Sequence, residues 1–246
     1  MNGRDGYFDE GVAARYDESD ADMFAPEAVE PVVDFLAAIA GRGRALELGV
    51  GTGRIALPLA ARGVRVHGIE LSRAMTARLQ AKPGGDDIDV TIGDFATTRV
   101  DATFSLAYLV FNTIMNLTTQ SAQIDCFRNV AAHLEPGGCF VIEVGVPALQ
   151  WLPVGEVFHV FRGGEDAWGI DEYDVASQAL TSHHVEMIDG RLEWTSIPFR
   201  YVWPSELDLM AQIAGMTLRE RWGGWKGEPF TKESRQHVSV WEMPGN

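Results

Sequence analysis

The sequence predicts an α/β fold in which helices cover both faces of a doubly wound, largely parallel sheet. Strand-like and helix-like segments alternate through the first 150 residues, which is typical of β-α-β units. The segment 103–111, TFSLAYLVF, is almost entirely apolar, as expected of a strand that is buried on both faces. After residue 146 the pattern changes, and the sequence predicts antiparallel strands instead.

Hydrophobic periodicity and short apolar runs locate the elements of the first part. We expect helices at 27–40, 54–63, 72–81 and 123–134, and strands at 44–48, 64–71, 89–95, 103–111 and 139–146. Ser72 is placed to cap the third of these helices. The run Glu135-Pro136-Gly137-Gly138 is expected to end the fourth helix.

The segment 147–203 shows no helical periodicity, and we expect it to form an inserted antiparallel β unit. Strand-like runs occur at 156–161, 182–188, 191–197 and 199–203. Asp189-Gly190 between two of these runs is a strong hairpin signal. The acidic residues Asp171, Glu172 and Asp174 predict a solvated loop, with attraction of an amine substrate as the alternative. The domains are therefore expected at 1–146 with 204–246, and at 147–203.

The last part of the chain predicts one helix and two strands. Ser205, with Asp208 three residues later, resembles a capping box at the start of a helix that extends to residue 216. Strands at 217–225 and 237–243 are expected to follow.

The charge balance argues against some classes of partner. The formal net charge is −15 and the isoelectric point is near 4.7. Phosphate backbones and anionic lipids repel such a chain, so we expect neither nucleic acid nor membrane as a partner. No apolar stretch reaches the roughly 18–20 residues of a membrane span, and the first residues lack a signal-peptide pattern. Cys126 and Cys139 lie in apolar patterns and are expected to be buried thiols of a cytoplasmic protein.

The stretch ALELGVGTGR, residues 45–54, places a glycine loop after the first strand. Its spacing is G-x-G-x-G, whereas a dinucleotide fingerprint is G-x-G-x-x-G. No Gly-Lys-Ser/Thr follows, which excludes a Walker-type phosphate loop. Glu47, two residues before Gly49, would repel a pyrophosphate and attract a cation.

Acidic residues also mark the ends of the next two strands. Glu70 lies 19 residues after Gly51, at the spacing of a carboxylate that accepts hydrogen bonds from ribose hydroxyls. Asp94, followed by Phe95, suits an adenine amine beside an aromatic ring. Ligands of open parallel sheets bind at this edge. The pattern therefore describes a ligand with a ribose, an adenine and positive charge, but without a need for phosphates.

The segments ELGVGTGR, GIELS, GDF and LEPGG together resemble the class I S-adenosyl-L-methionine-dependent methyltransferases over residues 7–146. The resemblance implies a Rossmann-like seven-stranded sheet whose last strand is antiparallel. It implies that Glu47 lies near the methionine end of the cofactor and that Glu70 holds the ribose. It assigns to the cofactor Tyr16, Glu47, Gly49, Gly51, Gly53, Arg54, Glu70, Leu71, Met75, Asp94, Phe95, Leu109 and Val110.

The acceptor side resembles small-molecule enzymes of this family. The N-P-P-Y motif of nucleic-acid amino-methyltransferases is replaced by LVFNTIMNL, and the Pro-Cys nucleophile of cytosine enzymes is absent. Strands inserted after strand five resemble the lid of sugar N,N-dimethyltransferases and glycine/sarcosine-type enzymes. We expect Phe111, Asn112, Asn116 and Tyr201 to line the acceptor site. Methyl transfer to a nitrogen or an oxygen of a small molecule by in-line displacement is therefore expected, with the acceptor atom open.

Several alternatives remain open on the sequence alone. His183 and His184 would point to opposite faces of a strand, so we expect no metal site there. His159 is a candidate base, although a satisfied strand histidine is the expectation. The inserted sheet could pair two subunits in a homodimer. A protein that binds S-adenosylmethionine without transferring the methyl group, and a nicotinamide-dependent oxidoreductase, are the competing functions.

Overall fold

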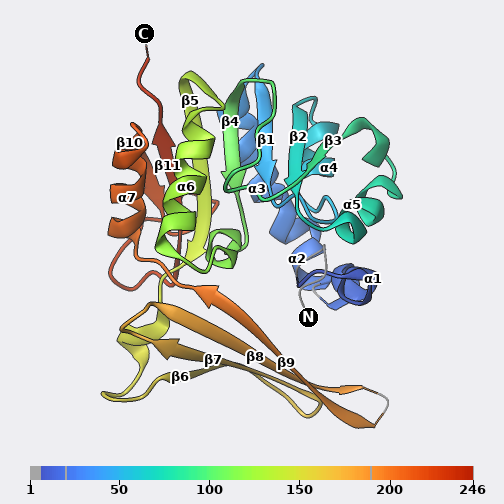
Figure 1. The fold of residues 1–246 in the computed structure, drawn as a ribbon, viewed down its shortest axis with the longest axis vertical. Helices are drawn as coiled ribbons and strands as arrows, with labels where there is room; N and C mark the ends of the chain where they lie inside the picture. The colour runs from blue at the N-terminus through green and yellow to red at the C-terminus, as the bar shows by residue number, and fades with distance from the viewer. Residues whose placement is uncertain (1–6, 20, 189, 246) are drawn as a thin grey trace.

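A seven-stranded sheet forms the centre of the computed structural model, which describes residues 7–19, 21–188 and 190–245 (Figure 1). The strands stand in the order β10-β11-β5-β4-β1-β2-β3. They are β1 (Arg44–Leu48), β2 (Arg65–Glu70), β3 (Asp89–Ile92), β4 (Phe104–Leu109), β5 (Leu134–Gly145), β10 (Thr217–Trp222) and β11 (Gln236–Glu242). Strand β11 runs antiparallel to β5 and β10, while β1–β5 pair in parallel. The predicted seven-stranded sheet with its antiparallel last strand is confirmed.

Helices cover both faces of this sheet. These helices are α3 (Pro26–Ala40), α4 (Ala56–Ala61), α5 (Arg73–Gln80), α6 (Gln120–Ala131) and α7 (Pro204–Ile213). Leu46 and Leu48 of β1 pack in the cluster that contains α6 and α7, whereas Ala45 packs in the cluster that contains α3 and α4. Because side chains alternate along a strand, Glu47 shares the α3 face with Ala45. In the described part of the chain no helix has the length and apolar character to cross a membrane.

Two further helices, α1 (Glu10–Ser19) and α2 (Ala21–Phe24), lie at the end of the sheet where the parallel strands finish (Figure 1). Glu10 of α1 forms a 3.0 Å ion pair with Arg78 of α5. The first turns of the chain are therefore fixed beside the loops that follow β1 and β2.

A second sheet lies across from the same end of the main sheet (Figure 1). Its antiparallel strands are β6 (Phe158–Gly163), β7 (Ala167–Asp174), β8 (Ala179–Ile188) and β9 (Arg191–Arg200). Three 3-10 helices, η1 (Gly85–Asp87), η2 (Thr113–Asn116) and η3 (Ala148–Trp151), complete the described part of the fold. Ile188 pairs with Arg191, as the predicted two-residue hairpin requires, although its Asp189 lies outside the described residues.

The acidic segment around residue 171 is a strand, so the prediction of a solvated loop was wrong. Asp171, Glu172 and Asp174 belong to β7, which pairs with both β6 and β8. Acidic residues are depleted in strands, and here pairing on both sides outweighs that preference.

Several element ends also differ from the prediction. Helix α7 begins at Pro204 with Trp203 as its N-cap, so Ser205 lies inside the helix and makes no capping box. Proline at the first helical position has no N–H to satisfy and favours this start. The helix expected at 123–134 is α6, capped by Thr119 and finished at Ala131. Strand β9 ends at Arg200, so Tyr201 does not lie on a strand.

Candidate functional site

The loop between β1 and α4 turns through glycines with positive φ. Gly49, Gly51 and Gly53 have φ values of 70°, 55° and 84°. These conformations strain any other residue. A Cβ added at Gly51 would have Met75 Cε, at 3.6 Å, as its nearest neighbour. The backbone of the loop is therefore open at Gly51 to the close approach of a ligand.

Glu70 joins this loop to the start of α5. Its Oε2 accepts a 2.8 Å hydrogen bond from the Gly51 N–H, and its Oε1 accepts a 2.8 Å bond from the Ser72 N–H. The side chain is 6% exposed, and burial raises the pKa of the carboxyl. Ser72 caps α5 as predicted, because its hydroxyl oxygen accepts from the Met75 N–H at 3.1 Å. The Gly51 N–H is thus directed to a carboxylate.

Glu47 is buried in the sheet beside Tyr108 of β4. The Tyr108 hydroxyl donates a 2.9 Å hydrogen bond to Glu47 Oε2. Burial raises the pKa of the Glu47 carboxyl to about 8, although this hydrogen bond and the charge of Arg54 oppose the rise. The charge of Glu70 adds to it, so the two carboxylates predicted from the sequence lie close enough to interact.

The loops after β1, β3 and β4 converge at one place. A Cβ added at Gly49 would lie 2.9 Å from Thr113 Cγ2 and 3.8 Å from Phe95 Cε1. Asp94 is exposed, and its Oδ1 accepts a 2.8 Å bond from the Ala96 N–H. The loops that follow these strands therefore lie side by side.

The first helix is tied to the glycine loop. Asp17 accepts a 2.6 Å bond from the Thr52 hydroxyl and forms an ion pair with Lys82, which also donates to the Thr52 carbonyl at 2.9 Å. Tyr16 packs against a small buried cluster that contains Met75. Arg54 donates to the Met23 carbonyl at 3.2 Å. Tyr16, Arg54 and Met75 are thereby brought to the glycine loop, whereas the Leu71 side chain is 46% exposed.

The chain after β4 is strained. Phe111 and Asn112 have φ values of 56° and 61°, a left-handed conformation that is uncommon outside glycine. Leu109 and Val110, just before them, are buried. The Phe111 N–H donates to Glu143 Oε2 at 2.9 Å, and Asn112 Oδ1 accepts from the Gly145 N–H at 2.7 Å. Strand β5 therefore fixes the turn.

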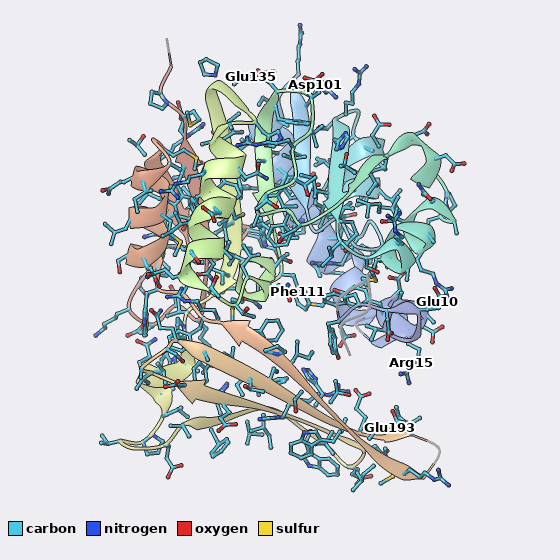
Figure 2. The ribbon with its side chains drawn as sticks, viewed as in Figure 1. Glu10, Arg15, Asp101, Phe111, Glu135 and Glu193 are labelled. Atoms are coloured by element: carbon cyan, nitrogen blue, oxygen red, sulfur yellow. The ribbon has the colours of Figure 1, made fainter. Side chains whose placement is uncertain are left out.

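Phe111 lies on the side of the main sheet that faces the second sheet, whereas Asp101 and Glu135 lie at the opposite end (Figure 2). Its ring stands 5.1 Å from the Arg54 guanidinium carbon. Asn116 donates to the Thr113 carbonyl at 3.2 Å, which stabilises the turn at η2. Tyr201 is 3% exposed and packs with Tyr173 and Leu180 of the second sheet.

Sequence reasoning missed three residues that support the site, namely Trp225, Glu143 and Asn129. Trp225 Nε1 donates to Glu143 Oε1 at 2.7 Å, on the carboxylate that holds Phe111. Asn129 Nδ2 donates to the Phe95 carbonyl at 2.8 Å and to the Thr98 carbonyl at 2.9 Å. The one signal for Glu143 was a carboxylate inside the otherwise apolar run CFVIEVGV.

Comparisons with known proteins agree with this geometry. Residues 45–138 match the family model described as a methyltransferase domain. The chain is similar to the cypemycin N-terminal methyltransferase of a Streptomyces species, with 31% identity over 202 residues, 80% of this chain and 82% of the relative.

Two solved structures share the whole fold. The CcbJ methyltransferase from Streptomyces caelestis superposes with a TM-score of 0.85 at 37% identity, covering 95% of this chain and 96% of that one. The amino pentose methyltransferase CalS10 from Micromonospora echinaspora, solved with S-adenosylmethionine bound, has a TM-score of 0.68 at 22% identity, covering 98% of this chain and 99% of that one. At that identity the second likeness concerns the fold alone.

Proposed function

The chain belongs to the class I S-adenosylmethionine-dependent methyltransferases, and on that premise we propose that it methylates an amino nitrogen of a small-molecule acceptor. The observation that most directly supports S-adenosylmethionine as the methyl donor is the hydrogen bond that the Gly51 N–H donates to Glu70. In a dinucleotide-binding loop the corresponding backbone faces a pyrophosphate. A carboxylate at this place favours the hydroxyls of a nucleoside over a diphosphate.

The residues at the site fit S-adenosylmethionine. Glu70 offers carboxylate oxygens to ribose hydroxyls, and Asp94 offers an exposed carboxylate beside the adenine position. Glu47 is buried on the α3 face below the glycine loop, where a cation would favour its ionised form. The open backbone at Gly51 leaves space for the nucleoside to approach.

Further residues are proposed to bind the methionine part of the cofactor. Leu109 and Val110 would present backbone groups at the end of β4, and Tyr16 would cover the carboxylate from α1. Met75 and Leu71 would border the adenosine from the start of α5. When bound, S-adenosylmethionine supplies a methyl group that a sulfonium already activates for in-line displacement. The protein then has to orient a neutral amine and to exclude water.

The acceptor is proposed to bind between the loop after β4 and the second sheet. Phe111 and Asn112 occupy the strained turn that faces that sheet, and Asn116 follows in η2. Tyr201 would support the pocket on the side of the second sheet, through its contact with Tyr173. We propose that residues 147–203 act as the lid of this pocket.

An amine is preferred over a hydroxyl for two reasons. Methylation of an amine needs no strong base, because the amine only has to arrive neutral. The relative that is 31% identical over 80% of this chain is named as an N-terminal methyltransferase. That name refers to an amine-bearing acceptor.

The experiment is methyl transfer from isotope-labelled S-adenosylmethionine to a defined panel. The panel holds two amines, a tri-alanine peptide with a free N-terminus and a methyl glycoside of an amino pentose. Each is paired with its hydroxyl counterpart, lactyl-alanyl-alanine and the unaminated methyl pentoside. Mass spectrometry is expected to find label on an amine. Binding of S-adenosylhomocysteine without transfer to any compound, or a melting temperature raised by NADH alone, would contradict the proposal.

A further inference from the structure

One face of the second sheet packs against the main domain. Tyr173 and Leu180 are register partners on β7 and β8, and they form a buried cluster with Tyr201. Met115 of η2 packs against the same cluster. Residues two positions apart on a strand share a face. This inner face also holds His159, Asp171, Ser182, His184 and Glu186.

The inner face is linked to the glycine loop through η2. Met115 of η2 packs against the inner-face cluster. Thr113, two residues earlier in η2, has its Cγ2 2.9 Å from the position of a Cβ added at Gly49. The same short helix therefore contacts the inner face and the glycine loop.

The outer face has a different character. His183 Nε2 lies 3.2 Å from Glu172 Oε2, and its Nδ1 lies 2.8 Å from the Ser196 hydroxyl. Val160 and Trp194 on this face are 62% and 63% exposed. His183 on the outer face thus has polar partners for both of its ring nitrogens.

A polar cluster on the inner face is only partly satisfied. Ser182, which is 6% exposed, is the register partner of Asp171 on β8, and its hydroxyl lies 3.2 Å from His184 Nε2. Burial raises the pKa of the Asp171 carboxyl, although Ser182 and the nearby histidines oppose the rise. His159 is the register partner of Asp171, and its Nδ1 is buried without a hydrogen-bond partner among the residues that the structure describes. A buried polar atom without a partner is costly, and a ligand that supplies the missing hydrogen bond removes that cost.

We propose that Asp171 and His159 together bind the amino group of the methyl acceptor. A carboxylate and a neutral imidazole nitrogen both accept hydrogen bonds, whereas an amino group carries two or three N–H donors. A hydroxyl carries a single donor and cannot donate to two acceptors at once. With the His159 proton on Nε2, so that Nδ1 accepts, the pair therefore favours an amine over a hydroxyl. This inference rests on the proposed function, since it names the residues that recognise the acceptor of that reaction.

The test compares Asp171→Asn and His159→Gln with Glu172→Gln, a matched control on the same strand as Asp171 but on the outer face. KM and kcat are measured with the panel amine that the unsubstituted protein methylates, beside the Kd of S-adenosylhomocysteine. Asp171→Asn is expected to raise KM at least tenfold and His159→Gln several-fold. The control should leave KM unchanged, and every variant should keep its S-adenosylhomocysteine affinity within about twofold.

An unchanged KM in Asp171→Asn overturns the inference, as does an equal rise in Glu172→Gln. Equal methylation of an amine and its hydroxyl counterpart overturns it as well. If Asp171→Asn fails to fold, His159→Gln on the edge strand β6 decides the question in its place. If the unsubstituted protein methylates no panel amine, the proposed function fails and the inference with it. If the unsubstituted protein methylates a panel amine and the KM for that amine is unchanged in both Asp171→Asn and His159→Gln, the inference is overturned and the proposed function stands.

Discussion

The Tyr108 hydroxyl donates a 2.9 Å hydrogen bond to Glu47 Oε2 inside the sheet, where the two residues are register partners on β4 and β1. Glu47 is 3% exposed, and burial raises the pKa of its carboxyl to about 8. Near neutral pH the carboxyl therefore holds a proton for most of the time. A cation bound nearby would favour the ionised form, so ligand binding and proton release are coupled at this residue.

We expect the affinity for S-adenosylmethionine to rise between pH 6.5 and 8.5. Below the pKa of about 8, binding has to displace the Glu47 proton, and the cost falls as the pH rises. Calorimetry in buffers of different ionisation enthalpy should detect proton release. In Glu47→Gln both the release and the pH slope should disappear. Equal slopes in the two proteins would contradict the coupling.

Glu47→Gln should also stabilise the ligand-free protein at pH 8. The pKa of Glu47 is about 8 in the folded chain, against 4.5 for an ordinary glutamate, so the folded state binds more protons between these values. The favourable contribution is complete below pH 4.5 and is lost as the pH rises toward 8. We expect the glutamine variant to gain about 4 kcal/mol in the free energy of unfolding at pH 8, because each pKa unit of the shift from 4.5 to about 8 corresponds to about 1.4 kcal/mol. Urea denaturation at pH 5, where the gain should fall to about 1 kcal/mol, provides the control.

Glu70→Ala should weaken S-adenosylhomocysteine binding by roughly 1–3 kcal/mol, because charge-assisted hydrogen bonds are lost. The substitution also frees the Gly51 and Ser72 N–H groups that Glu70 holds at 2.8 Å. Glu70→Gln keeps one acceptor oxygen and should show a smaller loss. An unchanged Kd in Glu70→Ala, measured by calorimetry, would remove this residue from the site.

The carboxylates at the strand ends could be predicted because strand length and loop length are local properties. Glu47, Glu70 and Asp94 each follow or end a recognisable apolar run, and parallel strands bring such ends together. The partners that hold the loops could not be predicted in this way. Trp225 and Glu143 are 82 residues apart, and the antiparallel pairing of β5 with β11 brings the connection that carries Trp225 to Glu143.

The strand β7 is a second case in which pairing between distant parts of the chain could not be predicted from the sequence. Its sequence WGIDEYD mixes the strand formers Trp168, Ile170 and Tyr173 with a glycine and three acidic residues, so the local signals for strand and loop conflict. Pairing with β6 and β8 decides its conformation, and with it the placement of Asp171 on the inner face. The sequence therefore offered Asp171 and His159 as separate candidates, but it could not show that strand pairing places them side by side.

Asn129→Leu should loosen the loop that carries Asp94. Asn129 Nδ2 donates to the Phe95 and Thr98 carbonyls, and the side chain is 2% exposed. Leucine is similar in size but leaves both carbonyls unpaired, which should destabilise the protein by about 2–4 kcal/mol. Hydrogen exchange should rise in residues 94–100 and not in β1. If hydrogen exchange in residues 94–100 is the same in Asn129→Leu as in the unsubstituted protein, Asn129 does not hold this loop in place.

Trp225→Phe should reduce methyl transfer without changing cofactor binding. Phenylalanine keeps an aromatic ring beside Phe35 but removes the N–H that donates to Glu143 Oε1. The Glu143 carboxylate is then less firmly held, and with it the left-handed turn at Phe111, a conformation that costs about 1–3 kcal/mol.

We expect kcat/KM for the acceptor to fall roughly tenfold in Trp225→Phe, equivalent to about 1.4 kcal/mol, while the Kd of S-adenosylhomocysteine stays within about threefold. Glu143→Gln should behave similarly, because the amide holds the Phe111 N–H less strongly than a carboxylate. Phe35→Leu disturbs the ring contact but not the hydrogen bond, and it should leave kcat/KM near its original value. A fall in Phe35→Leu equal to that in Trp225→Phe would assign the effect to ring packing, and the turn at Phe111 would then need another source of support.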